Sequence, residues 1–206
     1  MTYCLAPMTV PEINNLLGAT FVSTFQKEMD LIISPLRKYI AKGYPLALGK
    51  EQWEYVVSES IAGAEWCGAG KSIIDVKIGN IGIDVKGVSK EETKLYFNKK
   101  DTASIWNLLV DGWLSKVKSV DEYYLVGIVR EKETLNCSLC AFKVINTDLL
   151  YEDTLCKFTK KSMKVSGLAD SAFIETRVYS SKTRLEIKFK NKVWQDANYA
   201  LPIYKF

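Results

Sequence analysis

The feature that most constrains this chain is a pair of apolar, alternating runs, 72–78 and 81–87, separated only by Gly79-Asn80. A two-residue loop that begins with glycine favours a type II′ turn, which joins two antiparallel strands in a β-hairpin. Because the turn fixes the register of the strands, Asp75 is expected to face Asp84 directly. The sequence therefore predicts a tight hairpin with two opposed carboxylates.

Side chains alternate across a strand, so this hairpin has one apolar face, formed by six Ile and Val residues between 74 and 85, and one charged face. The charged face carries Asp75, Lys77, Asp84 and Lys86. Like charges that face each other destabilise a sheet unless a cation or a proton lies between them. A divalent ion held by oxygen ligands would remove this cost. Lys86 is then placed to donate to a phosphate or to accept a proton from a metal-bound water.

A hairpin with a solvated, charged outer face is the simpler interpretation, since acid-x-Lys triplets also occur at 92–94 and 186–188. The composition of the chain favours the other interpretation, in which the two aspartates hold a divalent ion. There is no histidine, which excludes Ser-His-Asp and Cys-His triads and zinc sites with histidine ligands. Catalysis would therefore have to come from Asp, Glu, Lys, Tyr, Ser or Cys.

The other elements indicate a mixed α/β layer fold in one domain. Helices are expected over 9–17, from about 19 to Gly43, over 51–62 and over 101–116, and strands over 123–129, 139–145, 173–179 and 184–190. The second helix carries an apolar stripe that we expect to be core, made of Phe21, Phe25, Met29, Ile32, Leu36 and Tyr39 or Ile40. We divide the chain into an N-terminal helical region, 1–45, and a core, 46–206, with a basic C-terminal portion.

The charge of the chain is mild overall but unevenly distributed. The total is +4, whereas the segment 157–192 alone holds ten basic and three acidic residues, a net charge of +7. A basic block on a slightly acidic body is the footprint expected of a polyanion-binding protein. Five cysteines, an odd number, and no apolar run near the roughly 18 residues of a membrane span favour free thiols and a cytoplasmic location.

At this point the residues resemble a known family. Asp75, followed by Asp84-Val85-Lys86, resembles the PD-(D/E)xK nuclease superfamily, which includes most type II restriction endonucleases as well as junction resolvases and repair nucleases. Ile74 stands where that family has proline. The resemblance covers residues 51–87. It implies a restriction-endonuclease-like mixed central β-sheet flanked by helices.

The resemblance also implies roles for individual residues. Asp75, Asp84 and the Val85 carbonyl would bind Mg²⁺, and Lys86 would orient or deprotonate the attacking water. A glutamate from the preceding helix would complete the site, with Glu54, which follows Trp53, as our choice and Glu59 as the alternative. A different pairing stays open, in which Asp84 is the first acid and Glu186-Ile187-Lys188 supplies the second acid and the lysine.

The function implied by the resemblance is Mg²⁺-dependent hydrolysis of double-stranded DNA, most simply by a homodimeric, sequence-specific type II restriction enzyme. Its partner would be a DNA methyltransferase acting on the same site, with no membrane partner. A structure-selective or repair nuclease, or a DNA-binding protein without catalysis, would use the same basic block. The expected DNA contacts are Lys90, Lys94, Lys160, Lys161, Lys182 and Arg184.

Overall fold

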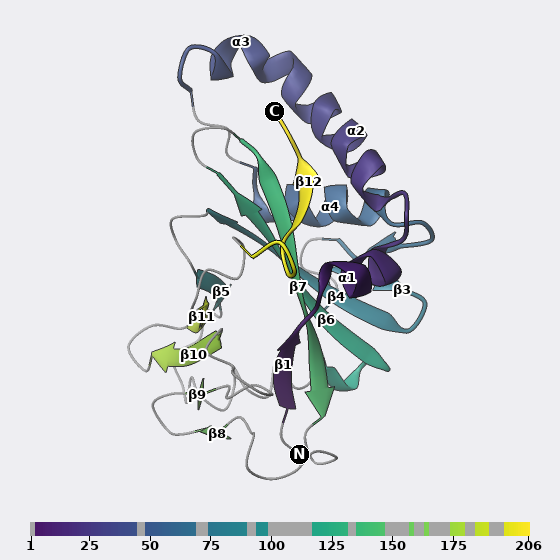
Figure 1. Cartoon of the computed structure of the whole chain (residues 1–206), viewed down its shortest axis with the longest axis vertical. Coiled ribbons are helices and arrows are strands. Elements are labelled where there is room, and N and C mark those ends of the chain that lie inside the picture. Colours follow the sequence, from purple (N-terminus) through teal and green to yellow (C-terminus); the bar gives the residue numbers. More distant parts are fainter. Residues whose placement is uncertain are drawn as a thin grey trace.

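A seven-stranded mixed sheet forms the centre of the molecule, with helices packed against it (Figure 1). The computed structural model describes residues 3–44, 48–68, 74–89, 94–98, 117–131, 135–146, 157–158, 163–164, 174–179, 184–189 and 196–206. The strands of this sheet are β1 (Tyr3–Pro7), β2 (Glu65–Trp66), β3 (Val76–Ile78), β4 (Ile81–Ser89), β6 (Glu122–Arg130), β7 (Cys137–Asn146) and β12 (Leu201–Tyr204). This confirms the expected mixed α/β class.

The order of the strands places β4 in the interior of the sheet. The order is β1-β7-β6-β4-β3-β2, and β12 also pairs with β7. The β4–β6 pair is parallel, and the other pairs of this sheet are antiparallel. The carboxyl half of β4 therefore has β6 along one side, whereas β3 is too short to cover its other side.

The hairpin predicted from the sequence is present as β3 and β4, with the predicted register. Val76 pairs with Ile83, and Ile78 pairs with Ile81. Gly79 has a φ of 57°, a left-handed conformation that glycine adopts without the steric cost of a Cβ atom. The local turn chemistry was therefore sufficient to fix the pairing.

The first strand of the hairpin is shorter than predicted. The pairing begins at Val76, and Ile74 and Asp75 lie in a bend before it. Ile74 consequently does not join the apolar face of Val76. Its Cδ1 would be 3.0 Å from a Cβ built on Gly82, so it packs on the face of β4 that also carries Asp84.

The helices are α1 (Val10–Leu17), α2 (Phe21–Ile33), α3 (Arg37–Ile40) and α4 (Lys50–Ser60), with a 3₁₀ turn at Ser34–Leu36. The expected start of α1 is confirmed, since the Thr9 N–H donates to the Glu12 carboxylate at 2.7 Å in a capping box. The expected helix over 51–62 is confirmed as α4. The expected helix over 101–116 falls outside the described residues.

The apolar stripe of the second helix is only partly core. Phe21, Phe25 and Met29 are buried as predicted. Ile33 rather than Ile32 continues the buried row, and Leu36 and Tyr39 are 38% and 59% exposed. Pro35 is the physical reason, because it cannot donate the hydrogen bond of an interior helical residue. The chain passes into the 3₁₀ turn there, and the residues after it turn away from the sheet.

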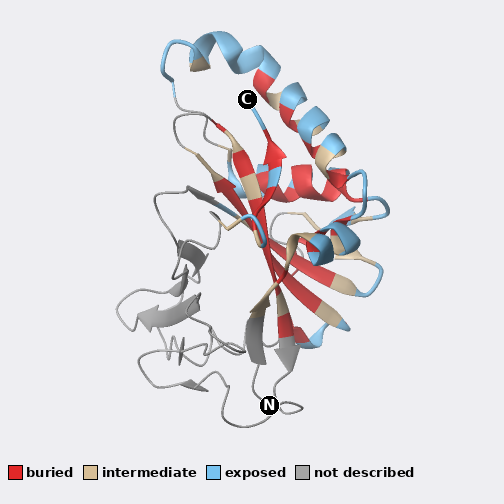
Figure 2. Cartoon of the chain, in the orientation of Figure 1, coloured by how far each residue is buried: buried red, intermediate tan, exposed pale blue. Residues whose placement is uncertain are grey.

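The core lies between the sheet and helices α1, α2 and α4, where Figure 2 shows the buried residues concentrated. Phe25 of α2 and Val57 of α4 pack in one cluster with Val85 of β4. Tyr123 and Leu125 of β6 are buried as well, although they belong to the opposite face of the strand. The central strands are therefore buried on both faces, which makes any charged group on them costly unless it is paired.

Two strands of the sheet, β1 and β12, were not predicted from the sequence. Both pair with β7, so segments from the two ends of the chain meet on one strand. The N-terminal region, expected to be helical, thus begins its described part with a strand. Among the described residues, no helix combines the length and the apolar character needed to span a membrane.

A second, three-stranded sheet has the order β10-β11-β5, and β8 (Lys157–Phe158) pairs with β9 (Met163–Lys164). The strands of the three-stranded sheet are β5 (Lys94–Asn98), β10 (Ile174–Tyr179) and β11 (Arg184–Phe189). The two strands predicted at 173–179 and 184–190 are therefore confirmed as an antiparallel pair. The sheet brings the backbone of the basic C-terminal portion beside β5, the strand that follows the hairpin.

Candidate active site

Three oxygens converge on one buried ammonium group at the carboxyl half of β4. Lys86 Nζ lies 2.6 Å from Asp84 Oδ1, 3.2 Å from Asp75 Oδ2 and 3.0 Å from the Val85 carbonyl oxygen. The side chains of the lysine and of the two aspartates are only 12%, 0% and 7% exposed. We call Asp75, Asp84, Lys86 and Tyr123 the central cluster.

Asp75 reaches the cluster from the open edge of β4 rather than from a paired position on β3. The ladder ends at the Val76–Ile83 pair, so the Val85 N–H has no partner on β3. The Asp75 carboxylate accepts this N–H at 2.8 Å, and the Asp75 carbonyl accepts the Cys67 N–H at 3.0 Å. These bonds fix both ends of the residue. The expected proximity to Asp84 is present, although the geometry that produces it differs from two directly opposed strand residues.

Tyr123 holds the second aspartate and was missed by the sequence analysis. Its hydroxyl donates to Asp84 Oδ2 at 2.9 Å, and both side chains are buried. Tyr123 pairs with Gly82 in the parallel β4–β6 ladder, two residues before Asp84. With Oδ2 held by the tyrosine, Oδ1 faces Lys86. No sequence signal marked this contact, because the two residues are 39 positions apart.

The carboxylate from α4 is Glu54, and Glu59 lies on the exposed side of the helix. Glu54 is 1% exposed. Lys50, one turn earlier, places its Nζ 3.0 Å from Glu54 Oε1 and 3.7 Å from Asp75 Oδ1. Glu54 Oε1 has this ion pair but no hydrogen bond to a described group. A buried carboxylate is costly unless it is paired, so the Lys50 ammonium is the group that compensates Glu54 here.

A glycine at the end of the cluster allows α4 to come this close. A Cβ built on Gly87 would lie 2.5 Å from Cδ1 and from Nε1 of the Trp53 ring, well inside van der Waals contact. Trp53 is buried and directly precedes Glu54. The absence of a side chain at position 87 therefore sets the approach of the helix that carries Glu54.

The electrostatics of the central cluster favour an added positive charge. Burial, followed by the neighbouring Asp84 carboxylate, raises the pKa of Asp75 to about 7, although the ammonium groups of Lys86 and Lys50 act in the opposite direction. Burial lowers the pKa of Lys50, but the carboxylates of Asp75 and Glu54 outweigh it, so that the net shift is upward. Near neutral pH the cluster thus lacks enough cationic charge to hold all its carboxylates ionised.

The donor set suits a hard divalent cation. Carboxylate and carbonyl oxygens are the ligands that Mg²⁺ prefers, and it usually keeps several waters beside one or two carboxylates. Within the described ranges, no group of three or more Asp, Glu, Cys or His side chains is arranged to hold a metal. The oxygens of the central cluster that could contact such an ion are those of Asp75, Asp84 and the Val85 carbonyl. These are the oxygens that now surround the Lys86 ammonium.

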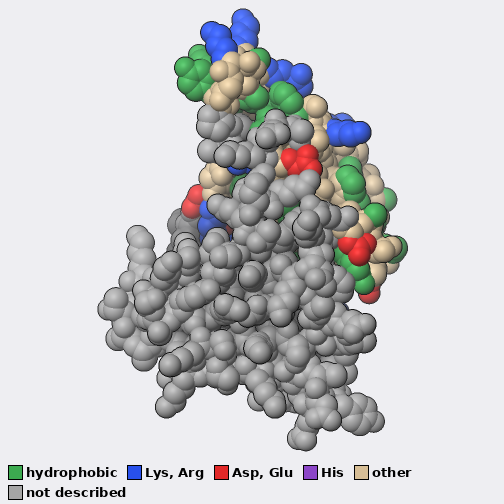
Figure 3. All heavy atoms as spheres, turned by 60° about the vertical axis from the view of Figure 1, so that its left-hand side comes forward, with side chains coloured by type: hydrophobic (Ala, Val, Ile, Leu, Met, Phe, Trp, Pro, Cys, Tyr) green, Lys and Arg blue, Asp and Glu red, His purple; other side chains and the backbone are tan. Residues whose placement is uncertain are grey.

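Most of the expected DNA contacts fall outside the described residues, namely Lys90, Lys160, Lys161 and Lys182. The backbones of Lys94 and Arg184 are described, on β5 and β11 of the three-stranded sheet. Glu186, the alternative second acid, also lies on β11, a strand of a different sheet from Asp84. The exposed basic residues Arg37, Lys38 and Lys42 lie on or near α3, at the tip where Figure 3 shows basic side chains gathered.

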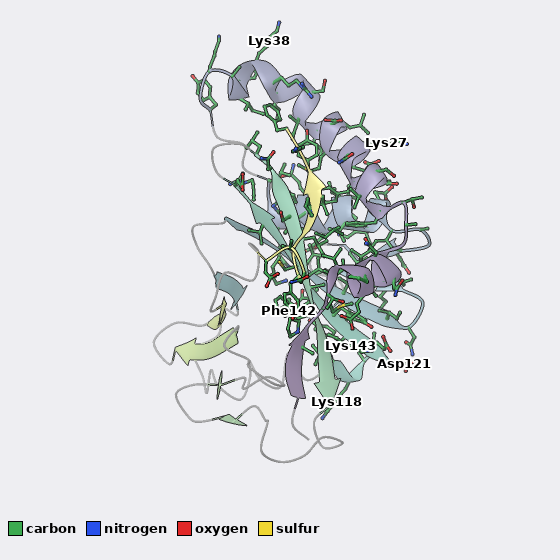
Figure 4. All side chains as sticks on the ribbon, viewed as in Figure 1. Lys27, Lys38, Lys118, Asp121, Phe142 and Lys143 are labelled. Carbon is green, nitrogen blue, oxygen red and sulfur yellow. The ribbon has the colours of Figure 1, made fainter. Side chains whose placement is uncertain are left out.

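A second cluster of charged and aromatic groups lies on the opposite face of β6. Lys143 of β7 places its Nζ 3.0 Å from Glu122 Oε1, and the Tyr124 hydroxyl also donates to the Glu122 carboxylate. The side chains of Lys143 and Glu122 are 40% and 41% exposed. Figure 4 shows Lys143 on its strand beside β6. We call Glu122, Tyr124 and Lys143 the edge cluster. The sequence analysis did not identify it.

The cysteines on β7 have a structural role. Cys137 and Cys140 are buried free thiols, and burial raises the pKa of each to about 12. A thiol with such a pKa is almost entirely protonated at neutral pH and is a poor nucleophile or metal ligand. Neither of these two thiols therefore competes with the carboxylates as the basis of this site.

No family model, curated protein or solved structure gives a significant match to this chain. The features of the chain that indicate a function are therefore those of the central cluster and of the residues around it. Together they combine two buried aspartates, a backbone carbonyl, a lysine and a helix glutamate within a short region of β4 and α4.

Proposed function

We propose that this protein is a Mg²⁺-dependent endonuclease that hydrolyses phosphodiester bonds in double-stranded DNA. One observation carries the proposal. The carboxylates of Asp75 and Asp84 and the carbonyl of Val85 surround a single cation, the Lys86 ammonium, in a buried position. Two carboxylates buried this close together carry a desolvation and repulsion cost, and a bound divalent cation would offset it.

The residues of the cluster have distinct parts in this reaction. Asp75, Asp84 and the Val85 carbonyl would hold Mg²⁺, which supplies Lewis-acid polarisation of the phosphate and a lower pKa for bound water. The Val85 N–H and the Tyr123 hydroxyl keep the two aspartates oriented. The attacking water gives up a proton and forms a new bond to phosphorus, a bridging P–O bond breaks, and the departing oxygen takes up a proton from solvent water.

Lys86 has to exchange partners for this chemistry to occur. Its ammonium now contacts the oxygens assigned to the metal. Once those oxygens face a divalent cation, Lys86 is free to donate to a phosphate oxygen or to orient the attacking water. A lysine with four methylene groups can move its charge by several ångströms without backbone movement. Displacement of Lys86 is therefore part of the proposed metal-binding step.

The biological role that we propose is restriction of DNA by a sequence-specific type II enzyme. In a homodimer, two central clusters can cut the two strands of a symmetric site. A DNA methyltransferase that modifies the same sequence would protect the host. Structure-selective or repair cleavage uses the same chemistry, and a digest of DNA of known sequence separates these roles, because only the restriction enzyme gives discrete fragments.

The test is incubation of supercoiled plasmid with the protein and Mg²⁺, compared with the same mixture containing EDTA. We expect nicked or linear products with Mg²⁺ only. Lys86→Met should remove cleavage and keep DNA binding, whereas Lys143→Met, a matched change in the edge cluster, should leave cleavage unchanged. DNA binding without cleavage on plasmid and linear substrates would replace this proposal with a non-catalytic DNA-binding protein.

A further inference from the structure

A second lysine stands between the central cluster and solvent. Lys50 is the first residue of α4, and its ammonium lies 3.0 Å from Glu54 Oε1 and 3.7 Å from Asp75 Oδ1. Its side chain is 59% exposed, whereas the carboxylates that it contacts are 2% and 7% exposed. Lys50 therefore joins two buried acids to the exposed surface of α4.

The two lysines of the site are held very differently. Lys86 makes three hydrogen bonds and is 12% exposed. Lys50 lies 3.0 Å from Glu54 Oε1 and 3.7 Å from Asp75 Oδ1, and its side chain is 59% exposed. An ammonium group has three N–H donors. Lys50, the more exposed of the two lysines, can therefore contact an incoming anion while it still contacts Glu54, whereas Lys86 is largely enclosed.

The charge balance of the site points to a monoanionic ligand. Glu54, Asp75 and Asp84 with Lys50 and Lys86 have one net negative charge when all are ionised. A bound divalent cation changes this to one net positive charge. A single phosphodiester group carries one negative charge and would neutralise the site. Because Lys50 is the exposed cation, its ammonium is the group that this phosphate meets first.

We propose that Lys50 is a positioning residue that binds a phosphate of the DNA strand at the entrance to the central cluster. This inference rests on the proposed nuclease function and assigns its substrate-binding cation. Lys50 takes no part in bond breaking. It anchors the strand while the residues of β4 carry the chemistry, so its loss weakens substrate binding more than the chemical step.

The decisive experiment compares Lys50→Met, Lys50→Arg and Lys27→Met with the wild type. Methionine keeps the apolar stem and removes the charge, and arginine keeps the charge. Lys27 is a matched exposed lysine that projects from α2 into solvent (Figure 4). Cleavage of an oligonucleotide duplex gives KM and kcat at saturating Mg²⁺. The concentration of Mg²⁺ that half-saturates thermal stabilisation reports metal binding without any turnover.

We expect Lys50→Met to raise KM about 10- to 100-fold, the effect of losing one hydrogen bond to a charged group. Its kcat should change much less. Mg²⁺ affinity should be equal or higher, because a competing cation has gone from Asp75. Lys50→Arg should restore KM, and Lys27→Met should match the wild type. An unchanged KM in Lys50→Met, or a loss confined to kcat or to metal affinity, would overturn the assignment.

The two proposals fail in different ways. If the wild type cuts DNA and Lys50→Met has the same KM, only the assignment of Lys50 is wrong. If the wild type cuts no DNA, the nuclease proposal is wrong, and fluorescence anisotropy with a labelled duplex and Mg²⁺ still tests Lys50. A 10-fold or larger rise in Kd for Lys50→Met over Lys27→Met would then support its phosphate contact, and equal Kd values would overturn it.

Discussion

The central cluster and the edge cluster contain the same types of group in nearly the same contacts, yet their electrostatics are opposite. Each joins carboxylates to a lysine and a tyrosine, and the tyrosines, Tyr123 and Tyr124, are adjacent on β6 and point to opposite faces of the sheet. In the central cluster the pKa of Asp75 is raised to about 7. In the edge cluster, hydrogen bonds from Tyr124 and then Lys143 lower the pKa of Glu122.

Burial is the cause of this difference. The aspartates of the central cluster are at most 7% exposed, whereas Glu122 and Lys143 are about 40% exposed. Water stabilises the ionised form of Glu122, so a single lysine suffices there. Two carboxylates inside the sheet lack that help and require further positive charge. The comparison teaches that the same types of group have opposite pKa shifts when one set is buried and the other is half-exposed.

The largest expected effect is on the rate of DNA cleavage, which should depend on the central cluster and not on the edge cluster. Asp84→Asn should lower DNA cleavage by more than about 100-fold, because even residues that merely orient a metal ligand are worth about 10- to 100-fold. Glu122→Gln, the corresponding change in the edge cluster, should leave the rate unchanged. Initial rates of plasmid nicking measure both variants, with circular dichroism to confirm folding. Equal activity of the two variants would remove the central cluster from the reaction.

The next effect concerns stability and pH. The carboxyl group of Asp75 has an ordinary pKa of 3.8 when unfolded and about 7 when folded. Between these values the native state holds a proton that the unfolded state has released, so the free energy of unfolding falls as pH rises through 7. The loss should be a few kcal/mol at most. Urea unfolding at pH 5 and pH 8 measures it, and Asp75→Asn should abolish the slope.

The edge cluster should show the opposite sign. The pKa of Glu122 is below its ordinary value of 4.5 when folded, so its contribution is present above that value and is lost as pH falls through the folded pKa. Glu122→Gln should therefore lower the free energy of unfolding only at pH values above the pKa of Glu122, and only slightly.

If the free energy of unfolding of the wild type instead rose from pH 5 to pH 8 and Asp75→Asn left that rise unchanged, the raised pKa of Asp75 would be refuted.

A smaller effect tests how α4 is held against the central cluster. Gly87→Ala should destabilise the fold by about 1–3 kcal/mol, since its Cβ would lie 2.5 Å from the Trp53 ring. Denaturant midpoints give the free energy of unfolding. Trp53→Leu should relieve part of that cost, so the double variant should be more stable than the sum of the single changes predicts. Additive losses would show that the two residues are not in contact.

The smallest effect is expected at the edge cluster itself. Lys143→Met removes an ion pair whose two side chains are about 40% exposed, and such pairs contribute roughly 0–1 kcal/mol. Thermal unfolding at low and high salt should show a small loss that salt diminishes further. A loss above this range would mean that the edge cluster has a structural importance comparable with that of the central cluster.

Some features of the site could be predicted from the sequence because they depend on neighbouring residues. The two-residue turn at Gly79-Asn80 specified the register of β3 and β4, and Asp75 lies in the bend directly before the paired part of β3. The helix over 51–62 could likewise be predicted from its sequence, and its packing buries Glu54 and leaves Glu59 exposed. The stripe on α2 was correct up to Met29 and failed beyond Pro35, where one backbone hydrogen bond is missing.

The sequence by itself determined the hairpin and the acidic residues that it carries, because turn geometry and strand alternation are local properties of the chain. Only the tertiary structure decided which groups surround those acids. Tyr123 reaches Asp84 through the parallel pairing of β4 with β6, and Lys50 reaches Asp75 through the packing of Trp53 on Gly87. Burial, and with it the raised pKa of Asp75, results from contacts between segments far apart in the sequence, which no local pattern encodes.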